Sequence, residues 1–283
     1  HRDEPFLAYL SFHSVHTPLI GRPDLVEKYK RKAEGISGEE FGPEEQVLPD
    51  VMQPRQVRLL QKHAVYAAMV EAMDLAVGKV LAGLDELWLA GNTAVMFMSD
   101  NGGLSTSEGS PTSNLPLRCG KGWLYEGGIR EPYVIKWPGV TSPGSTCDVP
   151  VTSTDFYPTM LDMAGLPPRS QQTLDGVSLV PLLRQKGSFP DRALFWHYPN
   201  YSNQGGFPGG AIRRGEWKLI ERFEDGRVHL YNLDQDLGEQ HDLAGREPQR
   251  VDELRRELHA WYGEVGAKFL EPRSPEGPQP FRP

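Results

Sequence analysis

The chain has 283 residues, of which 38% are hydrophobic, and it carries a formal net charge of −8. That length can hold one large domain and a smaller one with a sizeable core. The net negative charge argues against a general nucleic-acid surface. No apolar run reaches the roughly 20 residues of a membrane span. The composition therefore predicts neither a nucleic-acid partner nor a membrane span.

The first expected element is a strand over residues 6–12, followed by His13 and His16. In extended backbone, an odd spacing places two side chains on opposite faces, so we expect only one of them to point into a site. An imidazole can donate a proton near neutral pH, which makes such a histidine a candidate acid. A single histidine at a strand end is nevertheless more often structural, and the residues alone leave both interpretations open.

Residues 18–55 are rich in Pro, Gly and Glu and predict a long surface segment with one short helix over 23–32. A longer helix is expected over residues 56–89 because apolar residues recur there every three or four positions. We interpret this stripe as core: Met69, Met73, Val77, Val80, Leu84 and Leu87. The helix leads through Gly91-Asn92 into an apolar strand at 94–98, which makes a helix-to-strand unit of a doubly wound sheet.

Ser99-Asp100-Asn101-Gly102 directly follows this strand. Five apolar residues are typical of a buried parallel strand, and ligands in open α/β sheets bind just beyond the carboxyl ends of strands. A carboxylate beside a carboxamide offers the hard oxygen ligands that Ca²⁺ or Mg²⁺ takes. The alternative is that Asp100 and Asn101 simply form a turn.

A second loop, Cys119-Gly120-Lys121-Gly122-Trp123, follows about twenty residues later. Lys121 is a point-charge donor between two glycines that would let the backbone approach a ligand closely. A lone lysine in a loop is otherwise a solvated surface group. Trp123 could stack on a sugar face or pack between domains. Glu126, Arg130 and Glu131 could be catalytic carboxylates with a guanidinium, but we favour a structural ion pair beneath this loop, because the nearby glycines and Pro132 indicate tight packing.

The composition changes near residues 184–187, where we place a boundary between a first part, 1–186, and a second part, 187–283. The first part ends with a strand at 132–137 and a helix that Ser153-Thr154-Asp155 caps and Gly165 ends. The second part predicts antiparallel strands at 193–197, 210–213, 217–222 and 229–232, a covering helix and a Pro-rich tail. Val251, Leu254, Leu258 and Trp261 mark the apolar face of that helix. His197 and Tyr198, in an aromatic run, could reach a pocket or pack at the interface between the two parts.

Three segments occur in a telling order: His16-Thr17-Pro18 after a strand, Asp100-Asn101-Gly102 after a strand, and Gly120-Lys121-Gly122-x-x-Tyr125-Glu126-Gly127-Gly128-x-Arg130-x-Pro132. Together they resemble the sulfatase family of the alkaline phosphatase superfamily, and the resemblance covers nearly the whole chain. It implies an α/β fold with part of a doubly wound mixed sheet sandwiched by helices. It also implies a small C-terminal antiparallel sheet packed by a helix.

The same resemblance implies a sulfuric ester hydrolase. Asp100 and Asn101 would hold Ca²⁺, with Mg²⁺ as a possible substitute, Lys121 would contact a sulfuryl oxygen, and His16 would protonate the leaving oxygen. The expected substrate is a sulfated small molecule or saccharide, with Trp123 and His197 as further substrate-binding candidates. The expected location is periplasmic or secreted.

The chain departs from the family pattern at the nucleophile, a Cys or Ser in a Cys/Ser-x-Pro-x-Arg motif that becomes formylglycine. Neither Cys119 nor Cys147 stands in such a motif. The family places it, with two metal-binding aspartates, upstream of the strand that starts here at Pro5. We therefore expect the N-terminal part of the same domain as a partner and expect the 283 residues alone to be inactive. The alternatives are a phosphomonoesterase or phosphodiesterase of the superfamily and a non-catalytic anion-binding remnant.

Overall fold

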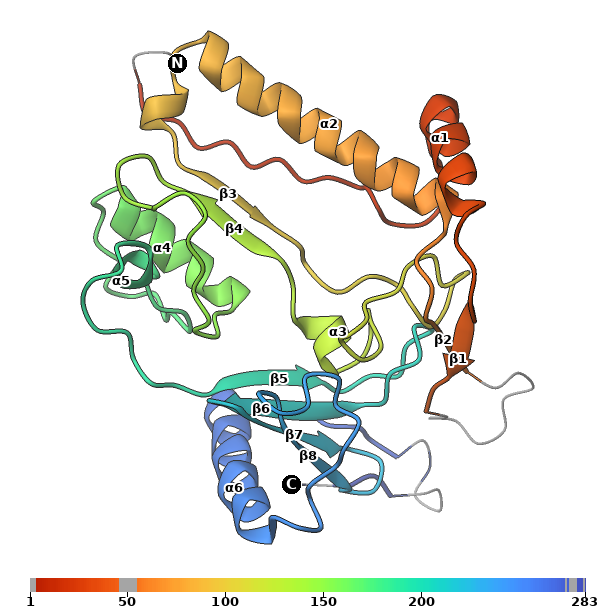
Figure 1. Ribbon diagram of the computed structural model, residues 1–283. Coiled ribbons are helices and arrows are strands. Elements are labelled where there is room, and N and C mark those ends of the chain that lie inside the picture. Colours follow the sequence, from red (N-terminus) through yellow and green to blue (C-terminus); the bar gives the residue numbers. More distant parts are fainter. Residues whose placement is uncertain (1–3, 46–54, 273, 275–278, 282) are drawn as a thin grey trace.

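The chain forms a mixed α/β structure with a long helix along one side and a four-stranded sheet on the other (Figure 1). This computed structural model describes residues 4–45, 55–272, 274, 279–281 and 283. Helix α1 (Pro23–Ala33) packs against the long helix α2 (Ala64–Glu86). Strands β3 (Val95–Met98) and β4 (Tyr133–Lys136) lie in the middle of the view. The expected α/β fold class is confirmed.

The N-terminal elements differ in two ways from the sequence-based expectation. Helix α1 confirms the predicted short helix, but β1 (Phe41–Pro43) and β2 (Gln56–Arg58) also form an antiparallel pair, and part of the segment between them, residues 46–54, lies outside the described residues. Because residues 56–58 belong to β2, helix α2 starts later than predicted. The 3₁₀ turn η1 (Ala90–Asn92) then leads into β3.

The α2 stripe that the sequence predicts as core is only partly buried, because Met73, Val77 and Leu84 are half-buried. Only Ala68 and Met69 of α2 are buried, whereas Val80 is 41% exposed and Leu87, just beyond the helix, 54%. A periodic stripe shows which residues share a helix face, but burial also requires a partner for that face. Among the described residues, α1 covers only part of α2, and the ion pair Lys28–Glu71 at 2.7 Å joins the two helices.

Residues 6–12 do not form the predicted strand, although they run as an extended segment through the region between α2 and β3 in Figure 1. Leu7 and Tyr9 are 80% and 82% exposed. A strand is defined by pairing, and no strand in the described part of the chain pairs with this segment. The expectation of a buried parallel strand at 94–98 also fails, because β3 is half-buried and pairs antiparallel with β4, from Val95↔Lys136 to Met98↔Tyr133.

The C-terminal sheet confirms the predicted antiparallel strands, in the order β5 (Leu194–Tyr198), β6 (Gly209–Arg214), β7 (Trp217–Arg222) and β8 (Val228–Asn232). Gly215 and Gly226 take positive φ in the two tight connections, as hairpin turns require. Helix α6 (Pro248–Val265) covers the sheet as expected and ends at left-handed Gly266.

Both faces of this sheet are packed. One face meets α6 through a cluster that includes Ile212, Leu219, Leu230, Leu254 and Leu258. The other face packs against the 119–125 loop and Phe207, and its buried cluster comprises Cys119, Trp123, Leu124, Tyr125, Phe207, Ala211, Ile220, Tyr231 and Leu233. The C-terminal sheet therefore supports the loop that carries Lys121.

Short helices complete the structure: α3 (Glu126–Ile129), η2 (Ser153–Asp155), α4 (Phe156–Met163) and α5 (Val180–Leu183). The predicted cap is present, with Thr152 and Asp155 forming a capping box at η2, and Gly165 beyond α4 has a φ of +67°. Asp155 also pairs with Arg192, which joins α4 to the chain entering β5. The boundary near residue 186 remains a prediction, since the 119–125 loop shares its core with the second part.

Candidate functional site

The two motif loops are joined through their backbones. Gly102 N donates to the carbonyl oxygen of Gly128 at 3.1 Å, and Lys121 N donates to that of Gly103 at 3.2 Å. These bonds leave little freedom between the turn that carries Asp100 and the loop that carries Lys121. Two segments about twenty residues apart in sequence thus form one structural unit.

Gly120 permits this close contact. A Cβ at Gly120 would collide with the Gly103 carbonyl oxygen and lie 2.6 Å from Asn114 Nδ2, closer than real side chains approach. The sequence predicted that this glycine would admit a ligand. In the structure it admits the neighbouring loop instead, and Asn114 ties both loops by donating to the carbonyls of Gly103 and Cys119, at 2.8 Å each.

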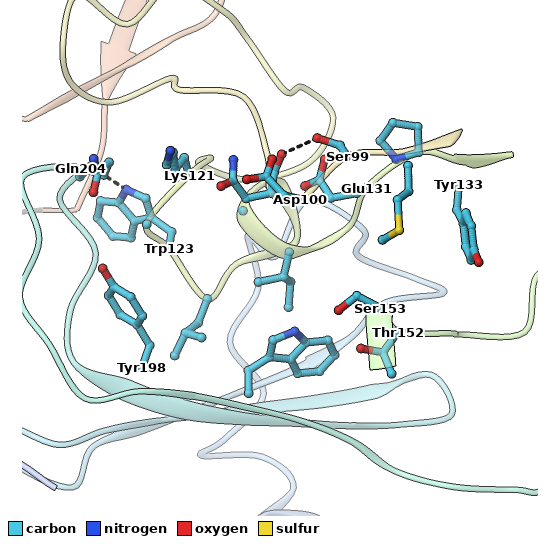
Figure 2. A pocket seen from close by; sticks show the side chains of 18 of the residues that line it. Ser99, Asp100, Lys121, Trp123, Glu131, Tyr133, Thr152, Ser153, Tyr198 and Gln204 are labelled. Carbon is cyan, nitrogen blue, oxygen red and sulfur yellow. Dashed lines mark hydrogen bonds between the residues drawn. The ribbon is translucent and has the colours of Figure 1, made fainter. Parts of the chain in front are cut away.

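A cavity of about 450 Å³ opens beside these loops (Figure 2). Its lining comes from the end of β3, the 119–124 loop, the segment around Glu131, η2 and β5. Its polar lining residues are Ser99, Asp100, Asn101, Lys121, Glu131, Thr152, Ser153, His197 and Gln204, and its aromatic ones are Trp123, Tyr133, Trp196 and Tyr198. Asp100, Asn101, Lys121 and Trp123 are thereby brought to one cavity. His197 also lines it, but its ring packs against Phe223 and Tyr262. His16 is not among the lining residues.

Asp100 and Asn101 form the turn that was the alternative to a metal site. The hydrogen bonds of this turn nevertheless leave the side-chain oxygens of both residues without a partner among the residues that the structure describes. Ser99 Oγ donates to the Asn101 carbonyl at 2.9 Å, and Asn101 Nδ2 donates to the Gly102 carbonyl at 3.0 Å. The Asn101 side-chain oxygen and the exposed Asp100 carboxylate remain as two hard oxygen donors, which fit a share of a Ca²⁺ site. Among the described residues, no cluster of three or more His, Cys, Asp or Glu could hold a metal ion.

Lys121 is half-buried and lines the same cavity as Asp100 (Figure 2). Its backbone is fixed by the bond to Gly103, but its ammonium group makes no hydrogen bond or ion pair with the described part of the chain. An ammonium group held at a cavity without a counter-ion can bind an anion there.

His13 and His16 lie in a turn rather than in extended backbone. His16 N donates to the His13 carbonyl at 2.8 Å, and the two rings meet edge to face at 5.5 Å. The argument that they lie on opposite faces is therefore wrong. His16 Nδ1 lies 2.7 Å from the carbonyl oxygen of Thr17, so when Nδ1 carries the proton it donates there and Nε2 is left for proton exchange.

The His16 turn is linked to the cavity indirectly. Thr17 Oγ1 donates to Glu108 at 2.9 Å, and Glu108 also accepts from Asn203 at 2.6 Å and from Gln204 at 3.1 Å. Gln204 lines the cavity. The contacts among described residues therefore link the turn that carries His16 to one wall of the cavity, through Thr17, Glu108 and Gln204.

Trp123 is only 3% exposed and packs against Tyr125 and Phe207. Its indole Nε1 donates to Thr106 Oγ1 at 3.0 Å. A ring buried in this way offers little face to a sugar, so its packing favours the structural alternative over stacking.

His197 lies on the α6 side of β5, where its ring contacts Phe223, Tyr262 and Phe269 and its Nε2 bonds the Lys268 carbonyl at 2.6 Å. Burial lowers the pKa of His197. Its neighbours Trp196 and Tyr198 instead pack toward the 119–125 loop and line the cavity. Strand alternation places Trp196 and Tyr198 on one face of β5. It was the available signal for Trp196, which the sequence-based prediction of the site had missed.

The predicted ion pair beneath the loop is present, but its main partner is remote in sequence. Glu126 is 2% exposed and accepts from Lys218 Nζ at 2.9 Å, which also lies 2.8 Å from Glu239. Arg130 is a weaker neighbour of Glu126, at 3.8 Å. Lys218 of β7 thus ties α3, and with it the Gly127-Gly128 turn, to the C-terminal sheet.

Glu131 is separate from that cluster. It lines the cavity, and burial, with a smaller contribution from the charge of Asp100, raises its pKa to about 8. A protonated Glu131 at neutral pH can donate a hydrogen bond into the cavity. The prediction that Glu131 belongs to the ion pair is therefore wrong, because in the fold this carboxyl lies close enough to Asp100 to feel its charge.

Two family models match the chain: sulfatase over residues 1–166, and the N-sulphoglucosamine sulphohydrolase C-terminal region over residues 119–265. The chain belongs to the sulfatase family. It is 37% identical to a sulfatase of Formosa agariphila over 92% of this chain and 46% of that protein, and 30% identical to arylsulfatase A of Homo sapiens over 90% and 48%. The chain therefore spans about half the length of these sulfatases.

Solved structures agree with this assignment. Ps i-CgsB in complex with k-i-k-neocarrahexaose superposes with a TM-score of 0.73 at 27% identity, covering 95% of this chain and 53% of the other. A second structure, in complex with its substrate D-glucosamine-2-N,6-O-disulfate, gives 0.60 at 26% identity, covering 72% and 42%. No helix in the described part of this sulfatase-family chain is long and apolar enough to cross a membrane.

Proposed function

We propose that this chain contributes the anion-binding part of a sulfatase site that hydrolyses a sulfate ester of a carbohydrate. The proposal rests on Lys121. This residue lines the cavity, and its ammonium group has no partner among the described residues. Its backbone N–H bonds Gly103, which fixes Lys121 next to the turn that carries Asp100. A sulfate monoester is a compact anion, and its cleavage leaves negative charge on an oxygen, so a fixed cation at this position suits binding and turnover.

Each side chain has a distinct task in this proposal. Lys121 binds a sulfuryl oxygen. Asp100 and Asn101 would hold a divalent cation, Ca²⁺ by family resemblance, which would neutralise charge on the sulfate. The His16 ring is held through Nδ1, and in its protonated form it donates a proton from Nε2 to the leaving oxygen. Formylglycine and the further metal-binding aspartates belong to the family pattern upstream of this segment and remain predictions, as does the periplasmic or secreted location.

The substrate class follows from similarity. Structures related to this chain are described as complexes with k-i-k-neocarrahexaose and with D-glucosamine-2-N,6-O-disulfate. The cavity of about 450 Å³ lies in the range of small-molecule sites. We therefore infer that the substrate is a sulfated saccharide.

The test is Lys121→Ala in the longest natural reading frame that contains this chain. We expect sulfate release from an aryl sulfate to fall by about 10²- to 10³-fold, the usual effect of removing one charge-stabilising donor. The melting temperature should hardly change, since Lys121 forms no internal ion pair. Exposed Lys79 in α2 provides the control substitution, Lys79→Ala.

An unchanged rate in Lys121→Ala would remove this residue from the mechanism. Faster release of phosphate than of sulfate by the unmutated protein would favour the phosphoesterase alternative. The 283 residues expressed alone are expected to release no sulfate, and sulfate release by them would contradict that prediction.

A further inference from the structure

One wall of the cavity comes from the C-terminal part of the chain, through Tyr198 on β5 and Gln204 in the loop that follows. The Gln204 loop is held firmly. The Gln204 carbonyl accepts from Thr106 Oγ1 at 2.7 Å and, at 3.3 Å each, from Trp123 Nε1 and Arg55 Nη1. Three donors on one carbonyl fix the backbone of Gln204 beside the Lys121 loop.

Gln204 also lies directly against that loop. A Cβ built on Gly122, which has a φ of +86°, would come within 2.5 Å of the Gln204 Cβ. Any side chain at position 122 would therefore push Gln204 away from the neighbouring Lys121. The glycine after Lys121 serves this contact and leaves the Gln204 side chain at the cavity wall.

In the Gln204 carboxamide, the nitrogen is held by a hydrogen bond and the oxygen is available to a ligand. Its Nε2 donates to Glu108 Oε1 at 3.1 Å. The hydrogen bond from Thr17 lowers the pKa of Glu108, so Glu108 is an ionised acceptor at neutral pH. With Nε2 so oriented, Oε1 has no partner in the described part of the chain and can accept a hydrogen bond from a ligand.

Tyr198 supplies a second group. It is half-buried, its side chain packs on the cavity side of β5, and its hydroxyl points toward Trp123 in Figure 2. This hydroxyl makes no hydrogen bond with the described residues. A phenol can donate one hydrogen bond and accept others, so it complements the acceptor of Gln204.

We propose that Gln204 and Tyr198 form a hydroxyl-binding subsite beside Lys121, which selects sulfated saccharides carrying a free hydroxyl next to the sulfate ester. Hydroxyl groups of the sugar donate to Gln204 Oε1 and accept from the Tyr198 hydroxyl while Lys121 binds the sulfate. A site with polar groups placed for a hydroxyl discriminates strongly against a ligand that lacks it, because those groups are then left unpaired. This inference rests on the proposed sulfatase function.

The experiment compares two substrates in the longest natural reading frame that contains the chain. One is a sulfated monosaccharide with a vicinal hydroxyl, found by screening position isomers, and the other is an aryl sulfate without hydroxyls. Gln204→Ala and Tyr198→Phe are each expected to lower kcat/KM for the saccharide about tenfold, the loss of one hydrogen bond. The aryl sulfate rate should stay within about twofold, and exposed Gln240→Ala serves as the control.

The deoxy analogue of the saccharide, with hydrogen in place of the vicinal hydroxyl, separates binding from a structural role. It should be a poorer substrate for the unmutated protein, and Gln204→Ala should have no further effect on it. Equal losses on the saccharide, its deoxy analogue and the aryl sulfate would overturn the subsite while leaving sulfatase activity intact. Absence of sulfate release from every substrate by the unmutated protein would instead refute the proposed function.

Discussion

At the scale of single residues, His197 shows how a position in a strand determines which face of the sheet a side chain occupies. The sequence placed His197 and Tyr198 together near a pocket, but alternate side chains of β5 point to opposite faces. Alternation could predict that Trp196 and Tyr198 share a face, yet not which face meets the site, because both faces of the sheet are packed. Asp100, Asn101 and Lys121, in contrast, were predictable because they belong to short motifs whose local backbone fixes their position.

The burial of His197 predicts a pH effect on stability. In the unfolded chain its pKa is about 6.5, and burial lowers the pKa in the folded state. As pH falls below about 6.5, the unfolded chain takes up a proton that the folded chain resists, so this residue's contribution to stability is progressively lost.

We therefore expect the difference in melting temperature between the unmutated chain and His197→Gln to shrink as the pH is lowered from 7.5 to 5.5. Thermal unfolding followed by circular dichroism at several pH values measures the difference. His241→Gln, at a histidine whose side chain is 81% exposed, is the control. A constant gap across this range would contradict the prediction.

At the scale of elements, the contact between α3 and β7 depends on one buried cation. Lys218 is fully buried between Glu126 and Glu239, and burial raises the pKa of Glu239 while Lys218 opposes that rise. The nearest other cation to Glu126 is Arg213 at 3.7 Å. Loss of Lys218 would leave buried Glu239 without an ion pair among the described residues, and Glu126 with only its longer contacts to Arg213 and Arg130.

Lys218→Met should therefore destabilise the chain by about 3–5 kcal/mol, the usual cost of breaking a buried ion pair by removing one partner. Urea unfolding at pH 7 measures the change, and Lys79→Met on exposed α2 is the matched control. Adding Glu126→Gln and Glu239→Gln should recover part of the loss. Equal stability of Lys218→Met and the unmutated chain would show that the pair contributes nothing.

The elements that sequence predicted well are those with a complete local signal. Helices α1 and α6 and strands β5 to β8 have regular periodicity and turn glycines within their own residues. Strand pairing over residues 6–12 and full burial of the α2 stripe failed because both depend on what lies alongside, which a local pattern does not contain. The β1–β2 pair joins segments separated by residues 44–55, and neither strand has more than three residues.

At the scale of the whole molecule, one region of the described chain is unusually apolar at its surface. Leu7 and Leu10 of the extended segment are 80% and 57% exposed, and Trp88 after α2 is 86% exposed. Extended backbone with apolar side chains and no pairing partner favours association between chains.

We expect the 283-residue chain to self-associate as its concentration rises, and Leu7→Ser with Leu10→Ser to weaken this without lowering the melting temperature. Sedimentation velocity over a concentration series measures the effect. Leu166→Ser, at a leucine that is 56% exposed after α4, is the control. Association that is unaffected by the Leu7 and Leu10 changes would place the contact elsewhere.

The backbone bonds between the two motif loops have a consequence for motion. Because Gly102 bonds Gly128 and Lys121 bonds Gly103, a fluctuation that breaks one contact loosens the other. Asp100 and Lys121 therefore belong to one cooperative opening unit, with a single free energy of local unfolding. The residues proposed to hold the cation and the anion lose their alignment together or keep it together.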